Sequence, residues 1–161
     1  MFGRSGLAML VCGLLLAGLV GVSAVAGVGQ READKGALFG VLTGKNEIGK
    51  DGKKGAGDRD GRGSATAIVD GNQLCFGLTV KNVDEPKAAH IHKGPKSKNG
   101  PIVVALEAPA EGDPGAASGC ATVSSSVSKA LLKNPHQFYW NIHTGSFPDG
   151  AVRGQVFAKA K

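Results

Sequence analysis

The segment "SATAIVDGNQLCFGLTV", residues 64–80, indicates how this chain folds. It contains two short runs typical of β-strands, residues 65–69 and residues 74–80, on either side of the tripeptide "DGN". Aspartate and glycine in such a turn supply the unusual backbone angles that a tight hairpin requires. We therefore expect a β-hairpin at this point in the chain.

Similar short runs, separated by turn residues, lie on both sides of this hairpin. Before it, "ALFGVLTG" at residues 37–44 is a candidate strand, followed by a long loop rich in Gly, Lys and Asp at residues 45–63. After it come "KAAHIHKG", "PIVVALEA", "GCATVSS", "QFYWNIHTG" and "AVRGQVFAK". About seven or eight short strands with glycine turns predict an all-β fold, either a Greek-key β-sandwich or a barrel.

One segment departs from this pattern and predicts a short helix. In "SSSVSKALLKNP", residues 124–135, the apolar residues fall near helical spacing. Ser125 or Ser126 is expected to cap the first turn, and Asn134 followed by Pro135 is expected to end the helix.

The N-terminal residues have the features of a secretory signal peptide. Residues 1–26 contain a positive Arg4, an apolar run and a small-residue cleavage site in "SAVAG". We expect residues 27–36 to be a linker and residues 37–161 to form one domain, because about 135 residues suffice for one core. The protein would then be secreted or periplasmic, with no membrane span after cleavage; an uncleaved N-terminal anchor is the alternative.

Two cysteines belong to the expected mature chain, Cys75 and Cys120. An even pair in an exported protein favours a disulfide, and a pair allows only one connectivity. Such a bridge would stabilise the fold by about 3 to 4 kcal/mol on the chain-entropy model. A metal-binding role for the thiols is disfavoured, since neither lies near another thiol or a histidine in the sequence.

The charge distribution argues against nucleic-acid binding. The formal net charge is +6, but much of the positive charge lies in the glycine-rich loop, where acidic residues are interleaved. Aromatic residues make up only 5% of the chain, so the stacking platforms of single-strand binders are missing.

Three histidines have the same outward phase on two predicted strands. His90 and His92 are two residues apart and share a face, while Ile91 between them is suited to the core. In "FYWNIH" the large apolar side chains Phe138, Trp140 and Ile142 point inward, which places His143 outward with Tyr139 and Asn141. The imidazoles meet only if their strands are neighbours and a loop covers them.

Three imidazoles with an open position are a ligand set suited to copper or zinc, and a flat arrangement favours copper(II). His136 is either a fourth ligand or a bystander in the loop before the last histidine strand. The alternative is that the histidines only form hydrogen bonds to loop backbone.

The histidine segments also carry a resemblance to a known family. The segments "AAHIHKGPKSKNGPIVVAL" and "NPHQFYWNIHTGSFPDGAVRGQV" resemble the CHRD domain, named for chordin and found in secreted bacterial proteins. Gly44 and Glu47 match the family's Gly-x-x-Glu, and the resemblance extends from about Ala37 to Phe157. It implies an extracellular fold and no general activity, and the growth-factor role of chordin is not expected here.

A fainter similarity, to Cu,Zn superoxide dismutase, bears on chemistry. That resemblance implies that His90, His92 and His143 ligate copper and that Arg153 lies near the open position and attracts superoxide. No zinc is expected, because "KGPKSKNGPIVV" after His92 has no further ligands. We thus expect a binding module with a copper site on the outer face; the alternatives are a copper-only superoxide dismutase-like enzyme and a structural or adhesive domain. A metal ion or small anion is the expected partner.

Overall fold

The predicted hairpin forms two neighbouring strands of an antiparallel sheet. β2 (Arg62–Asp70) pairs along its whole length with β3 (Gln73–Lys81), and Asp70 lies opposite Gln73. Gly71, in the two-residue turn between them, has φ of 59°, a conformation that a residue without a Cβ adopts readily. The hairpin expected from the sequence is therefore confirmed.

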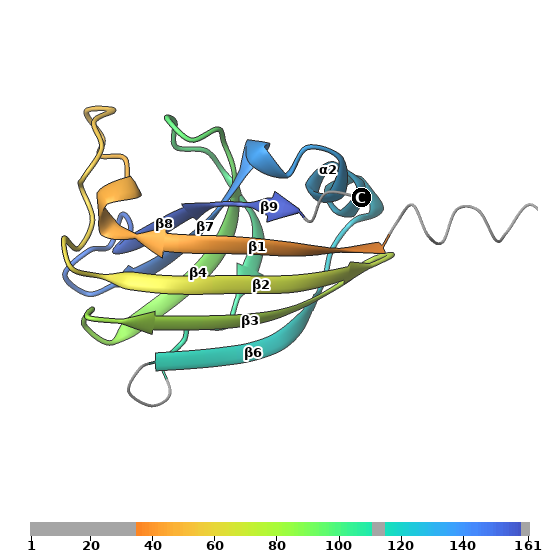
Figure 1. Cartoon of the computed structure of the whole chain (residues 1–161), viewed down its shortest axis with the longest axis horizontal. Helices are drawn as coiled ribbons and strands as arrows, with labels where there is room; N and C mark the ends of the chain where they lie inside the picture. The colour runs from red at the N-terminus through yellow and green to blue at the C-terminus, as the bar shows by residue number, and fades with distance from the viewer. Residues whose placement is uncertain (1–34, 111–114, 159–161) are drawn as a thin grey trace, which may run out of the picture.

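The computed structural model describes residues 35–110 and 115–158, and these form one antiparallel sheet that curls into a nearly closed barrel (Figure 1). The strand order is β5-β4-β7-β8-β1-β2-β3-β6, with β9 paired to β1. The other strands are β1 (Lys35–Thr43), β4 (Pro86–Lys93), β5 (Ile102–Leu106), β6 (Gly115–Thr122), β7 (Phe138–Thr144), β8 (Val152–Gln155) and β9 (Phe157–Ala158). In Figure 1, β1, β2, β3 and β6 face the viewer, and β4, β7 and β8 lie behind them.

The core fills the inside of the barrel with side chains from alternate positions of the strands. Ile91 of β4 and Phe138, Trp140 and Ile142 of β7 are all buried in it, as alternation predicted. The indole Nε1 of Trp140 donates a hydrogen bond to the Phe39 carbonyl on β1, 3.3 Å away. The all-β prediction is confirmed, and β1 begins two residues before the expected start of the domain.

The helix is present as α2 (Ser125–Lys133) at one end of the barrel (Figure 1), and it buries Leu131 in the core. The predicted cap was wrong by one residue. The Ser124 side chain accepts a hydrogen bond from the Val127 N–H, so Ser124 is the N-cap. Two short 3-10 turns, η1 (Gly44–Asn46) and η2 (Pro135–Gln137), precede the long loop and β7 respectively.

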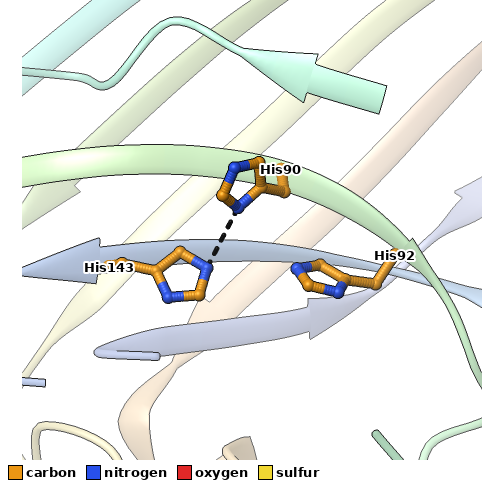
Figure 2. Close-up of side chains that lie close together, drawn as sticks. All are labelled: His90, His92 and His143. Atoms are coloured by element: carbon orange, nitrogen blue, oxygen red, sulfur yellow. Dashed lines mark hydrogen bonds between the residues drawn. The ribbon is translucent and has the colours of Figure 1, made fainter. Parts of the chain in front are cut away.

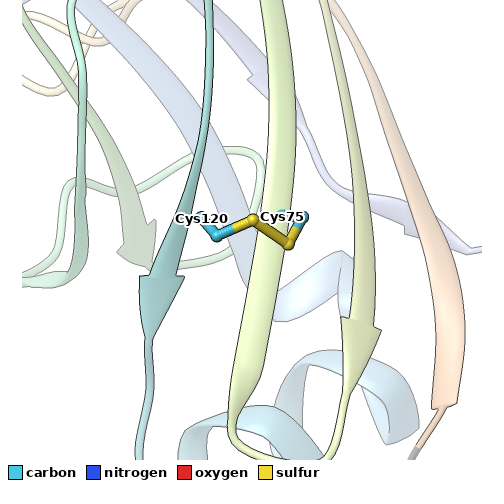
Figure 3. Close-up of a disulfide and its surroundings, with 2 residues drawn as sticks. All are labelled: Cys75 and Cys120. Carbon is cyan, nitrogen blue, oxygen red and sulfur yellow. A yellow bond between two sulfur atoms is a disulfide. The ribbon is translucent and has the colours of Figure 1, made fainter.

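The disulfide between Cys75 and Cys120 is formed and joins β3 to β6 (Figure 3). The two cysteines lie directly opposite each other in the strand register and are separated by 45 residues in sequence. The predicted bridge is therefore confirmed, and it joins β6, the last strand of the order, to its neighbour.

The expected signal peptide, residues 1–26, and most of the expected linker lie outside the described residues. Within residues 35–110 and 115–158, no helix has the length and apolar character needed to cross a membrane.

Candidate metal centre

The three histidines come together because β4 and β7 are hydrogen-bonded neighbours. In the register, Ala88 lies opposite His143, and His92 lies opposite Tyr139. His90, His92 and His143 thus leave the same outer face of the sheet, as their phase predicted. Figure 2 shows the three rings, two from β4 and one from β7, turned toward a common space.

The imidazole nitrogens are close enough to share one metal ion. One nitrogen from each of the three rings lies within 4.8 Å of the others. Two nitrogens bound to one ion, with bonds of about 2.0 to 2.1 Å, lie at most about 4 Å apart. Ring movements of about 1 Å or less are therefore enough to bring the three nitrogens into one coordination sphere. We call His90, His92 and His143 the three-histidine site.

His92 presents a lone pair that has no partner within the described residues. Its Nδ1 lies 2.9 Å from the Gly100 carbonyl oxygen, and a carbonyl can only accept, so Nδ1 carries the proton. The other nitrogen, Nε2, is then an unprotonated acceptor, and it is buried without a hydrogen-bond partner. Leaving a buried acceptor unpaired costs about 1 to 3 kcal/mol, a cost that ligation of a metal ion would offset.

His143 is oriented in the same manner from the other strand. Its Nδ1 lies 3.0 Å from the Pro148 carbonyl oxygen, so this nitrogen donates and Nε2 bears the lone pair. That lone pair faces Nδ1 of His90, 3.1 Å away. Backbone carbonyls that set the tautomer of a histidine are a common outer shell of metal sites.

The environment keeps the imidazoles of β4 neutral. The pKa of His90 is lowered to about 4, mainly by burial and also because the nearby His143 and His92 repel its charged form. Burial also lowers the pKa of His92, although its hydrogen bond to Gly100 acts in the opposite direction. Neutral imidazole is the form that binds a metal, so protons do not compete strongly for these rings near pH 7.

The outer face of the sheet is not open to solvent at this point. His92 is only 9% exposed, and the outward Tyr139 and Asn141 are 2% exposed. Residues 94–100, which we call the covering loop, lie over this face: the Tyr139 hydroxyl accepts from the Gly100 N–H, 3.2 Å away. The outward phase predicted for the histidines is correct, but their surroundings are those of a partly buried site.

Arg153 occupies the same outer face, but it is directed into the covering loop. Its guanidinium donates to the Asn99 Oδ1 atom at 2.7 Å and to the carbonyls of Pro95 and Lys98 at 3.0 and 2.8 Å. Its side chain is 1% exposed. Asp149, four residues before Arg153 in the sequence, forms an exposed ion pair with Lys50 rather than with Arg153. Arg153 thus holds the covering loop through its side-chain hydrogen bonds.

The match to a family profile covers most of this fold. The profile of the CHRD domain matches residues 38–156, which include all three histidines and Arg153. The chain belongs to the CHRD domain family. Comparison with curated proteins and with solved structures gave no match, so the second resemblance, to superoxide dismutase, gains no support from them.

In addition to its three-histidine site, this CHRD domain has a buried carboxyl, that of Glu47, which the sequence identifies only as part of the family's Gly-x-x-Glu pattern. Glu47 is 1% exposed, and burial raises its pKa to about 7, against the opposing effects of the Ile48 backbone and Arg153. One carboxyl oxygen lies 4.0 Å from Arg153, and the other has no partner within the described residues. The Gly-x-x-Glu pattern was the available signal, but the sequence does not reveal burial.

His136 lies apart from the cluster in this CHRD domain. It is exposed in η2 and is not among the residues whose ligand atoms gather within 4.8 Å. It borders a surface pocket of about 550 Å³ together with Lys96 and Phe157. Its backbone carbonyl accepts a hydrogen bond from the Gln155 side chain.

Proposed function

We propose that this protein is an exported CHRD domain that binds one copper ion through His90, His92 and His143. The observation that carries the proposal is the buried Nε2 of His92, which has no partner within the described residues and belongs to the cluster of three imidazoles. An all-imidazole set suits copper, and copper(II) binds nitrogen ligands more tightly than zinc and the other divalent first-row ions.

The compartment proposed for this binding is outside the cytoplasm. The disulfide between Cys75 and Cys120 supports that location, because such bridges persist in oxidising compartments. The signal-like N-terminal residues support it independently.

Binding is favoured over superoxide dismutation because of the position of Arg153. Steering a small anion requires a cation whose charge is accessible near the open position. The Arg153 guanidinium is buried, and its nitrogens donate to three acceptors of the covering loop. We therefore assign Arg153 no role in anion attraction.

Copper(II) titration of the metal-free protein, followed by electron spin resonance and calorimetry, tests the proposal. The expected result is one copper per chain with a nitrogen-rich spectrum. The double variant His90→Ala/His92→Ala should bind at least about 100-fold more weakly, since two of three ligands are lost. His136→Ala is the matched control, because it removes an exposed histidine outside the cluster, and it should bind like the wild type.

Three results would change the assignment. Equal copper affinity in the wild type and the double variant would refute the site. Tighter binding of zinc than of copper in competition would refute the choice of metal. Superoxide turnover by the copper-loaded protein that is lost in His143→Ala would replace the binding function by the enzymatic one.

A further inference from the structure

Arg153 is linked to the three-histidine site indirectly, through the covering loop and Tyr139. It lies on β8 opposite Asn141 of β7, and its side chain reaches the covering loop on the outer face. A buried guanidinium requires acceptors for its donors, since an unpaired buried charge is strongly unfavourable. The three acceptors of its side-chain hydrogen bonds, in Pro95, Lys98 and Asn99, all belong to the covering loop, and the Glu47 carboxyl lies 4.0 Å from the guanidinium.

The last residue of this loop sets the tautomer of His92. Gly100 follows Asn99 directly, and its carbonyl oxygen accepts the His92 Nδ1 proton at 2.9 Å. The Gly100 N–H, in the preceding peptide, donates to the Tyr139 hydroxyl, and the same hydroxyl lies 3.5 Å from the Gly100 carbonyl oxygen, so Tyr139 holds this residue from the sheet side. Space at this glycine is tight as well: a Cβ on Gly100 would lie 1.8 Å from the Lys93 carbonyl oxygen. The position of the Gly100 carbonyl thus depends on how the loop is held.

Tyr139 separates Arg153 from His92. The His92 ring stacks on the Tyr139 ring with centroids 4.8 Å apart, and the Arg153 guanidinium carbon lies 3.4 Å from the Tyr139 centroid. β4 and β8 flank β7 on opposite sides, so His92 and Arg153 pack on opposite faces of the tyrosine ring. The guanidinium therefore influences His92 through the loop and the ring, without direct contact.

We propose that Arg153 is a positioning residue for the metal site, a role that rests on the proposed copper function. By holding Pro95, Lys98 and Asn99, it keeps the Gly100 carbonyl where it accepts the Nδ1 proton of His92. His92 then presents Nε2 as an unprotonated ligand in a fixed orientation. Without this acceptor, His92 populates both neutral tautomers and more than one ring orientation, and copper binding weakens.

Two variants test this role, and they disturb the contacts between Arg153 and the covering loop to different extents. Arg153→Lys keeps the positive charge but loses the planar fork that reaches several acceptors at once. Asn99→Ala removes one acceptor of the guanidinium, together with the hydrogen bond from Asn99 to the Ile48 carbonyl, and leaves the guanidinium in place. Arg62→Lys is the matched control, because Arg62 also donates to backbone carbonyls, those of Arg59 and Gly61, but does not contact the covering loop.

Two readouts separate a positioning role from a general effect on folding. Imidazole nitrogen chemical shifts of the metal-free protein report the His92 tautomer, and copper titration with spin resonance reports affinity and nitrogen coordination. We expect the Nδ1-protonated form of His92 in the wild type and Arg62→Lys. In Arg153→Lys we expect mixed tautomers and copper affinity lowered by about 10- to 100-fold, the usual effect of losing an outer-shell partner. Asn99→Ala should change both readouts in the same direction, by less.

Each outcome decides a separate question. A folded Arg153→Lys protein with the wild-type tautomer and wild-type copper affinity overturns the positioning role and leaves the copper site intact. If the wild type binds no copper, the proposed function is wrong, and mixed tautomers in the variants would still establish that Arg153 positions His92. If Arg153→Lys does not fold, unchanged readouts in Asn99→Ala would overturn the proposal.

Discussion

The Nδ1 atom of His90 lies 3.1 Å from the Nε2 atom of His143, although 53 residues separate the two histidines in the sequence. The proton of this hydrogen bond belongs to His90. His143 already uses its own Nδ1 proton toward the Pro148 carbonyl, so its Nε2 is the acceptor. In the metal-free protein His90 is therefore the Nδ1-protonated tautomer, and the hydrogen bond occupies the place of a shared ion.

A change of tautomer at His90 on metal binding is the first prediction. If His90 ligates through Nδ1, the proton must leave that atom, and the neutral ring then carries it on Nε2. Imidazole nitrogen shifts measured with copper(I), which is diamagnetic, should show His90 changing from the Nδ1-protonated to the Nε2-protonated form. His136 should keep its spectrum. A His90 spectrum unaltered by a full equivalent of metal would exclude His90 as an Nδ1 ligand.

The buried carboxyl of Glu47 predicts a loss of stability with rising pH. Burial raises its pKa from 4.5 to about 7 in the folded protein. Between these values the folded state holds a proton that the unfolded chain releases, so the contribution of Glu47 to stability is present below about pH 4.5 and declines up to about pH 7. Each pH unit in that range corresponds to about 1.4 kcal/mol, which gives a total of about 3 kcal/mol.

Urea unfolding of the metal-free wild type and of Glu47→Gln at pH 5 and pH 8 measures this effect. The glutamine side chain does not titrate, so the wild type should lose about 2 to 3 kcal/mol relative to the variant between the two pH values. The low pKa of His90 acts in the opposite direction below about pH 6.5, but it is common to both proteins and cancels in the difference. The prediction is contradicted if the difference in free energy of unfolding between the wild type and Glu47→Gln is the same at both pH values. It is also contradicted if the wild type gains stability relative to the variant as the pH rises.

Loss of the disulfide should lower stability without weakening metal binding. In the double variant Cys75→Ala/Cys120→Ala, the free energy of unfolding is expected to fall by about 3 to 4 kcal/mol, because the open chain gains conformational entropy. Copper affinity should stay within about twofold, since β3 and β6 carry none of the three histidines. Unfolding in urea and copper titration of the same sample check both statements. An unchanged midpoint of unfolding would show that the bridge does not stabilise the barrel.

Gly40 should not tolerate a side chain, because β1 passes close to Trp140. A Cβ at Gly40 would lie 2.3 Å from Cδ1 of Trp140, whose ring is buried in the core. We expect Gly40→Ala to lower the free energy of unfolding by about 1 to 3 kcal/mol, the usual range for overpacking. Gly145→Ala is the control, because no atom lies within 4 Å of the added Cβ, and its effect should stay within about 0.5 kcal/mol. Trp140 is the single tryptophan, so its fluorescence follows the unfolding transition directly. Equal stability of Gly40→Ala and Gly145→Ala would contradict the close contact between Gly40 and Trp140.

Structural features that depend only on neighbouring residues in the sequence were predicted correctly. The turn at Gly71 and the inward phase of Ile91 and Trp140 follow from neighbours in sequence, because strand alternation and turn conformation are local properties. The cap of α2 was wrong by one residue because three serines in succession offer equivalent hydroxyls. Only the conformation of the backbone distinguishes them, and Ser124 is the residue in extended conformation before the first turn.

The surroundings of the site were less predictable. The buried state of His92 and Glu47 depends on the path of the long loops, whose composition indicates exposure. The similarity to Cu,Zn superoxide dismutase implies a place for Arg153 near the open position of a copper site. The side-chain hydrogen bonds of Arg153 are with residues 95–99, more than 50 positions earlier in the sequence. No pattern in either segment indicates that the two segments lie close together.

From the amino-acid order one can read that His90, His92 and His143 point away from the core, because that follows from the two-residue period of a strand. Their convergence follows from the antiparallel pairing of β4 with β7, which sets Ala88 against His143 and His92 against Tyr139. Strand order and register depend on packing among distant segments, whereas the facing of a side chain depends on its own strand. The site therefore required both: local alternation selected the face, and long-range pairing brought three ligands to one place on it.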